Sequence, residues 1–178
     1  MGEEEGPPVA SLEQLFGQAA CARVLIKKKA LDLATASGGC FPAVTRVEGK
    51  ELTTFVPAAS LEPDAATHKV RWPPVKSLER SLEKLLRSHD GDVSRLLDCC
   101  RLMLVFDHVS QLVACLDAVS QDPQLHVMRI KNRLRLGDDA YLTGGFRYAA
   151  STTAHTHTHA HAAGCTTACT TAPRFATP

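Results

Sequence analysis

The spacing of apolar and polar positions changes from one segment of this chain to the next. Residues 11–37 are typical of one long helix, and Gly38 and the glycine after it are expected to end it. Residues 46–56 favour a short pair of strands with Gly49 at the turn. Residues 73–74 are both proline, which disfavours helix before them and suits a helix start after them. We therefore expect a boundary at residue 74.

The clearest helical pattern follows the two prolines. Ser77 is typical of a helix N-cap, and Gly91 is typical of a stop. At about 100° per residue, the apolar residues of this segment share one arc and the basic residues share the opposite arc. This pattern predicts a helix with a core face and a cationic face. The apolar arc holds Val75, Leu78, Leu82, Leu85 and Leu86, and the basic arc holds Lys76, Arg80, Lys84 and Arg87.

Two strands and another helix are predicted beyond that helix. Residues 102–106 form a continuous apolar run, which suits a strand buried on both faces. Residues 109–119 are apolar at helical spacing, and residues 127–134 alternate as in a half-buried strand. The order helix, strand, helix, strand predicts the α/β class. The alternating strand has Met128 and Ile130 on one face and Arg129, Lys131 and Arg133 on the other.

The last part of the chain, residues 150–178, consists almost entirely of Thr, Ala and His. Without large aliphatic residues it cannot bury enough apolar surface to offset its ordering entropy, so we expect a disordered tail. We also expect its removal from about residue 151 onward to leave stability unchanged. Its histidines and Cys165 and Cys169 have spacings that suit zinc, but a low-complexity tract with adventitious metal affinity is the simpler interpretation. The chain thus divides into residues 1–74, 75–149 and 150–178.

Composition places few limits on function. A chain of 178 residues with a formal net charge of +1 suits one ordinary domain and gives no general affinity for nucleic acid or membranes. The seven cysteines are odd in number and irregularly spaced, which favours reduced thiols in an intracellular protein. The acidic N-terminus has no apolar run, and no stretch approaches the roughly 20 apolar residues of a membrane span. We expect a cytoplasmic protein without a membrane partner.

Residues 75–147 carry a set of motifs that resembles a known family. The phrase Val-Lys-Ser is followed by a second lysine at position 84, by Asp98 ahead of an apolar strand, and by a Gly-Phe-Arg turn at residues 145–147. In these features the chain resembles the RelA/SpoT family, the synthetases of guanosine tetra- and pentaphosphate. The resemblance implies a nucleotidyltransferase-like mixed sheet flanked by helices. It also implies transfer of pyrophosphate from ATP to the ribose 3′-hydroxyl of GDP or GTP, with Mg²⁺ as the cofactor.

The resemblance assigns roles to individual residues. It implies that Lys76, Ser77 and Lys84 contact the ATP phosphates and that Asp98 is catalytic and binds the metal. Phe146 takes the place of an aromatic residue that stacks on guanine, next to Arg147 in the same turn. The substrate-binding residues that it implies are therefore Lys76, Ser77, Lys84, Lys131, Arg133, Phe146 and Arg147, the two basic strand residues lying near the acceptor nucleotide.

Two departures from the family weaken the expected activity. Pro74 stands where the family has arginine, and no acidic residue follows Asp139, although the family carries a catalytic glutamate on a strand beyond the Gly-Phe-Arg turn. A phosphoryl-transfer site normally uses more than one carboxylate around its Mg²⁺. We therefore expect a C-terminally incomplete, inactive fragment of a pyrophosphokinase. The alternative is a non-catalytic module that binds a nucleotide, RNA or a protein, with nucleic acid less favoured and tRNA left open.

Simpler interpretations of the same residues also remain open. The basic arc of the helix at residues 77–90 is typical of a solvated helix face. Asp98 is equally typical of a capping or turn residue.

Overall fold

A long helix, α1 (Leu12–Ser37), opens the fold. The computed structural model describes residues 11–61, 70–134, 148–155 and 165–171. The Ser11 hydroxyl accepts a hydrogen bond from the Gln14 amide at 3.1 Å, and Gly38 ends the helix with a φ of 73°, a left-handed conformation that glycine adopts without strain. The predicted helix is confirmed. Its buried face holds Leu15, Ala19, Ala22, Ile26, Ala30 and Ala34.

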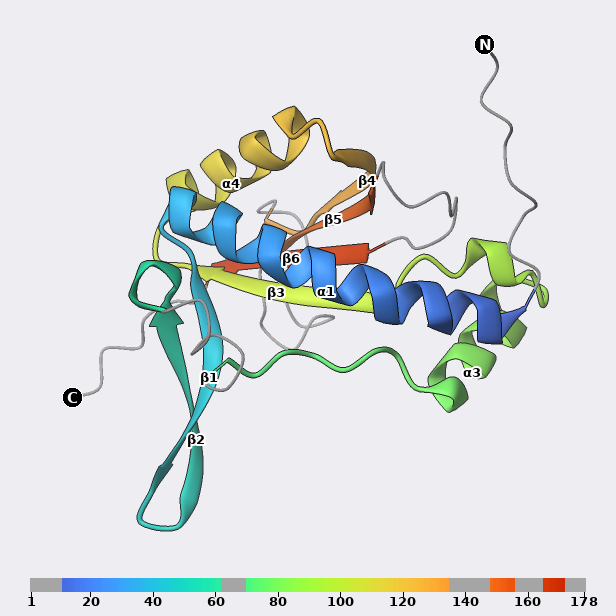
Figure 1. Ribbon diagram of the computed structural model, residues 1–178, viewed down its shortest axis with the longest axis horizontal. Helices are drawn as coiled ribbons and strands as arrows, with labels where there is room; N and C mark the ends of the chain where they lie inside the picture. The colour runs from blue at the N-terminus through green and yellow to red at the C-terminus, as the bar shows by residue number, and fades with distance from the viewer. Residues whose placement is uncertain (1–10, 62–69, 135–147, 156–164, 172–178) are drawn as a thin grey trace.

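The predicted strand pair is also confirmed and is longer than expected. Strands β1 (Cys40–Val47) and β2 (Lys50–Pro57) form an antiparallel hairpin that projects from the body of the molecule (Figure 1). Glu48 and Gly49 have φ values of 51° and 79°, and two positive φ values are typical of the two-residue turn that matches strand twist. A 3-10 turn, η1 (Ala58–Ser60), follows the hairpin.

The centre of the fold is a six-stranded mixed sheet in the order β2-β1-β3-β6-β5-β4. Its other strands are β3 (Cys100–Phe106), β4 (Leu125–Asn132), β5 (Tyr148–His155) and β6 (Cys165–Thr171). Strands β3 and β6 are parallel, and the other neighbours are antiparallel. Helices α1 and α4 (Val109–Gln121) pack against one another and on these strands (Figure 1). The α/β class is therefore confirmed, as are the predicted strands and helix between residues 102 and 134.

The prediction of a disordered tail at residues 150–178 is wrong for two stretches of backbone. Strand β5 crosses the expected boundary at residue 149, and β6 lies between β3 and β5 in the middle of the sheet. Threonine is β-branched and suits strands, and backbone pairing on both sides of β6 does not need large side chains. Ala149, Ser151 and Thr153 are buried because small residues let the strand pack closely against its neighbours.

The hydrophobic core joins the first two of the three zones that the composition suggested. The buried cluster extends from Leu15 on α1 through Leu102 and Leu104 on β3 to Ala149 on β5. Strand β4 lies at the sheet edge. Met128 and Ile130 are about half exposed, so the prediction that they form the buried face of a half-buried strand is wrong. The register shift between Val127 and Arg129 breaks the alternation on which that prediction relied. Residues 156–164, which hold three of the tail histidines, lie outside the described residues.

Helix α3 (Leu78–Ser88) forms where predicted, but it buries a different face. Ser77 is the N-cap, and its hydroxyl accepts a hydrogen bond from the Arg80 amide at 3.4 Å. Leu85 and Ser81 are the buried residues, whereas the other leucines of the apolar arc are exposed. The helix is rotated so that Lys84 turns toward Asp98, and this ion pair replaces contacts that the leucines were expected to make. The exposed leucines are Leu78, Leu82 and Leu86, at 55%, 44% and 78%.

Candidate functional site

The candidate site lies where the segment before α3 meets the start of β3. The Lys76 amide donates a hydrogen bond to the Cys99 carbonyl at 2.9 Å, which ties this segment to the residue before β3. A 3-10 turn, η2 (Val93–Arg95), precedes Asp98 and leads the chain back toward the sheet. Ser77 is the N-cap of α3, as predicted, whereas Lys76 precedes the helix and the prediction that it lies on the helix is wrong. Their position nevertheless puts them at its N-terminus.

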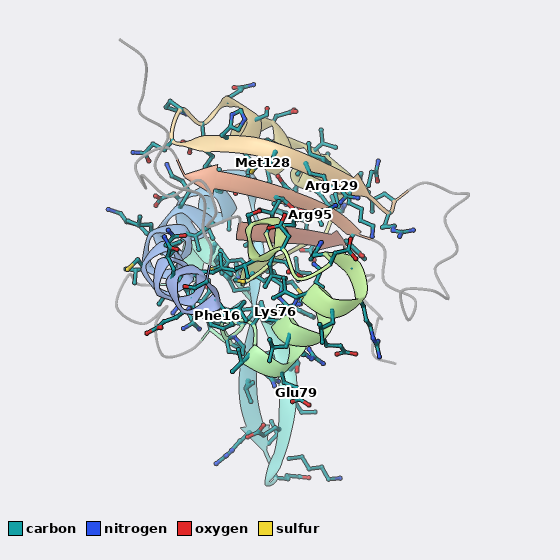
Figure 2. The ribbon with its side chains drawn as sticks, turned by 90° about the vertical axis from the view of Figure 1, so that its right-hand side faces the viewer. Phe16, Lys76, Glu79, Arg95, Met128 and Arg129 are labelled. Atoms are coloured by element: carbon teal, nitrogen blue, oxygen red, sulfur yellow. The ribbon has the colours of Figure 1, made fainter. Side chains whose placement is uncertain are left out.

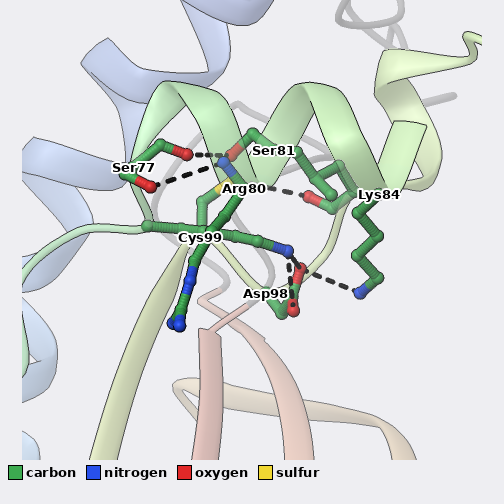
Figure 3. Close-up of polar contacts among 8 residues, drawn as sticks. Ser77, Arg80, Ser81, Lys84, Asp98 and Cys99 are labelled. Atoms are coloured by element: carbon green, nitrogen blue, oxygen red, sulfur yellow. Dashed lines mark hydrogen bonds and ion pairs between the residues drawn. The ribbon is translucent and has the colours of Figure 1, made fainter. Parts of the chain in front are cut away.

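Two lysines converge on one carboxylate at this junction (Figure 3). The Lys76 Nζ lies 3.1 Å and 3.2 Å from the two carboxylate oxygens of Asp98. The Lys84 Nζ lies 3.0 Å from the first of these oxygens. The side chains are 7% exposed for Lys76, 25% for Asp98 and 37% for Lys84. The structure therefore brings together three of the residues that the sequence singled out, and we call them the Lys76–Asp98–Lys84 cluster.

The electrostatics of the cluster favour the ionised carboxylate. Burial acts to raise the pKa of Asp98, but hydrogen bonds and positive charge from Lys84 and Lys76 outweigh it and lower that pKa below its ordinary value. Two ammonium groups and one carboxylate leave a formal excess of one positive charge. This excess lies where Lys76 and Lys84 meet Asp98, level with the second turn of α3. The arrangement is suited to binding an additional anionic group.

The serines of the site have structural partners. The Ser77 hydroxyl caps α3, and the Ser81 hydroxyl donates to the Ser77 carbonyl at 2.9 Å (Figure 3). Ser77 thus fixes the start of the helix that carries Lys84. Its predicted contact with a phosphate remains a prediction.

Cys99 lies against the cluster but is not suited to nucleophilic chemistry. It is buried, and its thiol donates to the Leu96 carbonyl at 3.8 Å. Burial, and then the charge of Asp98, raise the pKa of Cys99 to about 11. A thiol with so high a pKa is almost entirely protonated near neutral pH, so we assign Cys99 a packing role.

The other basic residues of α3 differ from Lys84. The Arg87 Nη1 forms an ion pair with the Glu83 Oε1 at 2.8 Å on the exposed side of the helix. Arg80 is exposed as well. For these two residues the solvated-face interpretation is confirmed. The Lys84 side chain instead forms an ion pair with Asp98.

The two basic strand residues lie away from the cluster. The sheet register places Lys131 level with Ala150 on β5, Ala168 on β6 and Met103 on β3. Met103 is five residues beyond Asp98, and Arg133 lies farther still in the same direction. Arg129 is instead level with Arg101, close to the Asp98 end of β3. Figure 2 labels Arg129 on β4 and Lys76 beside α3.

Sequence reasoning named neither Arg101 nor Arg129 as a site residue. Arg129 belongs to the predicted basic face of its strand, and only the register through Thr152 and Thr166 aligns it with Arg101. Phe146 and Arg147 lie outside the described residues. Among the described residues, no helix is long and apolar enough to cross a membrane.

Comparison with known proteins supports the fold. No protein-family profile and no curated protein matches this chain. A chain of the crystal structure of the complex between the Type VI effector Tas1 and its immunity protein is similar, with a TM-score of 0.50 and 17% sequence identity. The match covers 94% of this chain and 63% of that one, so this chain spans less than two thirds of its length. At this identity the similarity concerns the fold alone.

Proposed function

We propose that this chain is a RelA/SpoT-like nucleotide pyrophosphokinase domain that binds ATP through the Lys76–Asp98–Lys84 cluster and is inactive, or nearly so, in pyrophosphate transfer. The observation that carries the proposal is the convergence of both predicted phosphate-binding lysines on the predicted catalytic aspartate. These three residues are separated by up to 22 positions in the sequence, and they are the residues that the resemblance groups at the ATP phosphates and the metal.

The cluster suggests how phosphates would bind. Each lysine is held within about 3 Å of an anionic oxygen of Asp98, and phosphate oxygens are acceptors of the same kind. Incoming phosphates would bind Lys84, the more exposed of the two lysines, which would then contact both the phosphates and Asp98. Lys76 would stay buried against Asp98. The excess positive charge would lower the energy of the bound triphosphate.

Magnesium fits this site in part. Mg²⁺ is usually held by one or two carboxylates together with substrate phosphates, and Asp98 offers one carboxylate. Among the described residues, no group of three His, Cys, Asp or Glu side chains is placed to share a metal ion. We therefore propose that Asp98 would hold Mg²⁺ only together with the nucleotide, whose charge the metal would help to neutralise. The lysines would orient the phosphates.

The transfer step has weaker support than binding. The acceptor GDP or GTP would be contacted by Lys131, Arg133, Phe146 and Arg147, and the first two lie toward the far end of β3 from Asp98. No acidic residue follows Asp139, so strands β5 and β6 supply no second carboxylate. Chemistry of this class depends on positioning and charge stabilisation, which one carboxylate provides poorly.

Thin-layer chromatography with labelled ATP and either GDP or GTP tests the transfer step. We expect binding of ATP in a calorimetric titration, with no or only trace guanosine tetra- or pentaphosphate. Efficient transfer would contradict the inactive state. Transfer that persisted in Asp98→Asn would show that Asp98 has neither a catalytic nor a metal-binding role.

A second candidate function is a non-catalytic protein-binding module. The observation in its favour is the exposed stripe of Leu78, Leu82 and Leu86, which follows one face of α3. Such stripes are recognised in helix-mediated docking, and the similar structure holds an effector together with its immunity protein. A folded chain that bound no ATP, but bound a protein in a manner lost in Leu82→Asp, would favour this candidate.

A further inference from the structure

One face of the sheet is covered by helices α1 and α4. A small apolar cavity is lined by Ile26 of α1 and Val119 of α4 together with Leu104, Leu125 and Thr153 of strands β3, β4 and β5. These strand residues therefore point toward the helices. Since neighbouring residues in a strand point to opposite sides, Arg101 and Met103 of β3 and Tyr148, Ala150 and Thr152 of β5 point to the other face.

An irregularity in β4 adds basic residues to this second face. The register of β4 against β5 shifts between Val127 and Arg129, so that Val127 pairs with Thr153 and Arg129 pairs with Thr152. A bulge of this kind re-aims the residues beyond it. Without it, Arg129 would share the helix-covered side with Val127. With it, Arg129 and Lys131 lie on the same face as Arg101, which we call the basic sheet face.

The strands that form the basic sheet face carry no acidic side chain. Strands β3, β4, β5 and β6 contain no aspartate or glutamate. Arg101, Arg129 and Lys131 are exposed, and none of them forms an ion pair with a carboxylate in the part of the chain that the structure describes. The Arg133 Nε at the end of this row is buried without a hydrogen-bond partner. The strands of this face therefore supply positive charges and no carboxylates to pair with them.

The spacing of the cations, and the small side chains between them, indicate an extended ligand. Arg101 and Arg129 are separated by three strand spacings, which is about 14 Å. A chain of phosphates can contact both cations along its length. Between them β5 presents the small, partly exposed Ala150 and Thr152, with the ring of Tyr148 farther along. An aromatic ring beside spaced cations is the arrangement on which unpaired bases stack.

We propose that the basic sheet face binds single-stranded nucleic acid, with Arg101, Arg129 and Lys131 on its phosphates and Tyr148 under a base. The formal net charge of +1 gives no sign of this, because the aspartates and glutamates that balance these cations belong to other segments of the sequence. The proposal does not depend on ATP binding by the Lys76–Asp98–Lys84 cluster.

Fluorescence anisotropy with a labelled oligouridine RNA of about 12 nucleotides, at about 50 mM salt, tests this proposal. The double variant Arg101→Ala/Arg129→Ala should bind at least about tenfold more weakly than the original chain. Its dependence of log K on log salt should be shallower by about 1.4, or about 0.7 for each cation removed. The matched control Lys28→Ala/Lys50→Ala removes two exposed charges from α1 and β2 and should stay within about twofold.

Several results would overturn the proposal. The first is an absence of RNA binding by the folded chain, and the second is an equal loss in the two double variants. Tighter binding of duplex RNA than of the single strand would also contradict it. Lys84→Ala should leave RNA binding unchanged, and a loss there equal to that of Arg101→Ala/Arg129→Ala would mean one general anion site. Circular dichroism of each variant verifies folding, and Arg129→Gln provides a milder second variant of the same face.

Discussion

The Lys76–Asp98–Lys84 cluster and the strand pair β5–β6 stabilise the fold by different kinds of contact. In the cluster, two lysines share one carboxylate, so each contact depends on a single side chain. In β5 and β6, the backbone pairs with neighbours along most of each strand, and the described side chains of β5 are small except for Tyr148. Contacts of the first kind are sensitive to one substitution, whereas contacts of the second kind are lost only when the strand is lost.

The largest expected effect is the removal of β6. A chain that ends at residue 155 leaves β3 and β5 without the strand that pairs with both. We expect it to lose cooperative unfolding in urea, because the middle of the sheet is then open. A chain that ends at residue 171 keeps every described strand and should unfold as cooperatively as the full chain. Equal behaviour of the two shortened chains would restore the expectation that this region is dispensable.

The next effect in size concerns Asp98. Asp98→Asn keeps the shape of the side chain but leaves Lys76, 7% exposed, without its counter-ion. We expect a loss of about 2–3 kcal/mol in the free energy of unfolding at neutral pH, since hydrogen bonds to charged groups are worth this much. Urea denaturation at pH 7 measures it, and a loss no greater than that in Arg87→Ala would contradict a structural role for the cluster.

The pH dependence of stability gives a second test of the Asp98 charge. The folded-state pKa of Asp98 is lowered, so its contribution to stability is fully present above the ordinary carboxyl pKa of about 3.9. That contribution disappears as the pH falls through the lower folded-state pKa. The difference between the original chain and Asp98→Asn should therefore shrink below about pH 4. A difference that stayed constant down to the acid transition would show that the Asp98 charge is not what stabilises the fold.

The smallest effect is expected inside β5. Thr152→Ala removes a partly exposed side chain but leaves the backbone pairing of the strand intact. We expect a change in the free energy of unfolding of about 0.5 kcal/mol or less, as for ordinary surface substitutions. A loss as large as that of Asp98→Asn would mean that side-chain packing, and not backbone pairing, holds β5 in place.

Much of the first two thirds of the fold was predictable because local signals agree there. Ser11, Gly38 and Gly49 mark element ends by capping and turn chemistry, and the apolar run of β3 matches a buried strand. Strands β5 and β6 have no such signal, since their burial and pairing come from neighbours distant in the sequence. Threonine and alanine alone do not specify a strand.

The candidate site was predictable in its members but not in its contacts. The family resemblance grouped Lys76, Lys84 and Asp98, whereas the orientation of α3 was wrong because helical periodicity does not say which face meets the protein. That Leu85 is buried while Leu82 is exposed depends on the ion pair of Lys84. Arg129 lies on the same face as Arg101 because of the bulge in β4, and no sequence pattern predicts that bulge.

The most direct test of the central claim compares ATP affinity in Lys84→Ala and Arg87→Ala by isothermal titration calorimetry in the presence of Mg²⁺. Both residues lie on α3, but Lys84 contacts Asp98 and Arg87 contacts Glu83. We expect Lys84→Ala to weaken ATP binding by about tenfold or more, as for the loss of a charge-assisted phosphate contact, and Arg87→Ala to change it little. Equal losses, or no ATP binding by the folded original chain, would contradict the assignment of the Lys76–Asp98–Lys84 cluster as a nucleotide site.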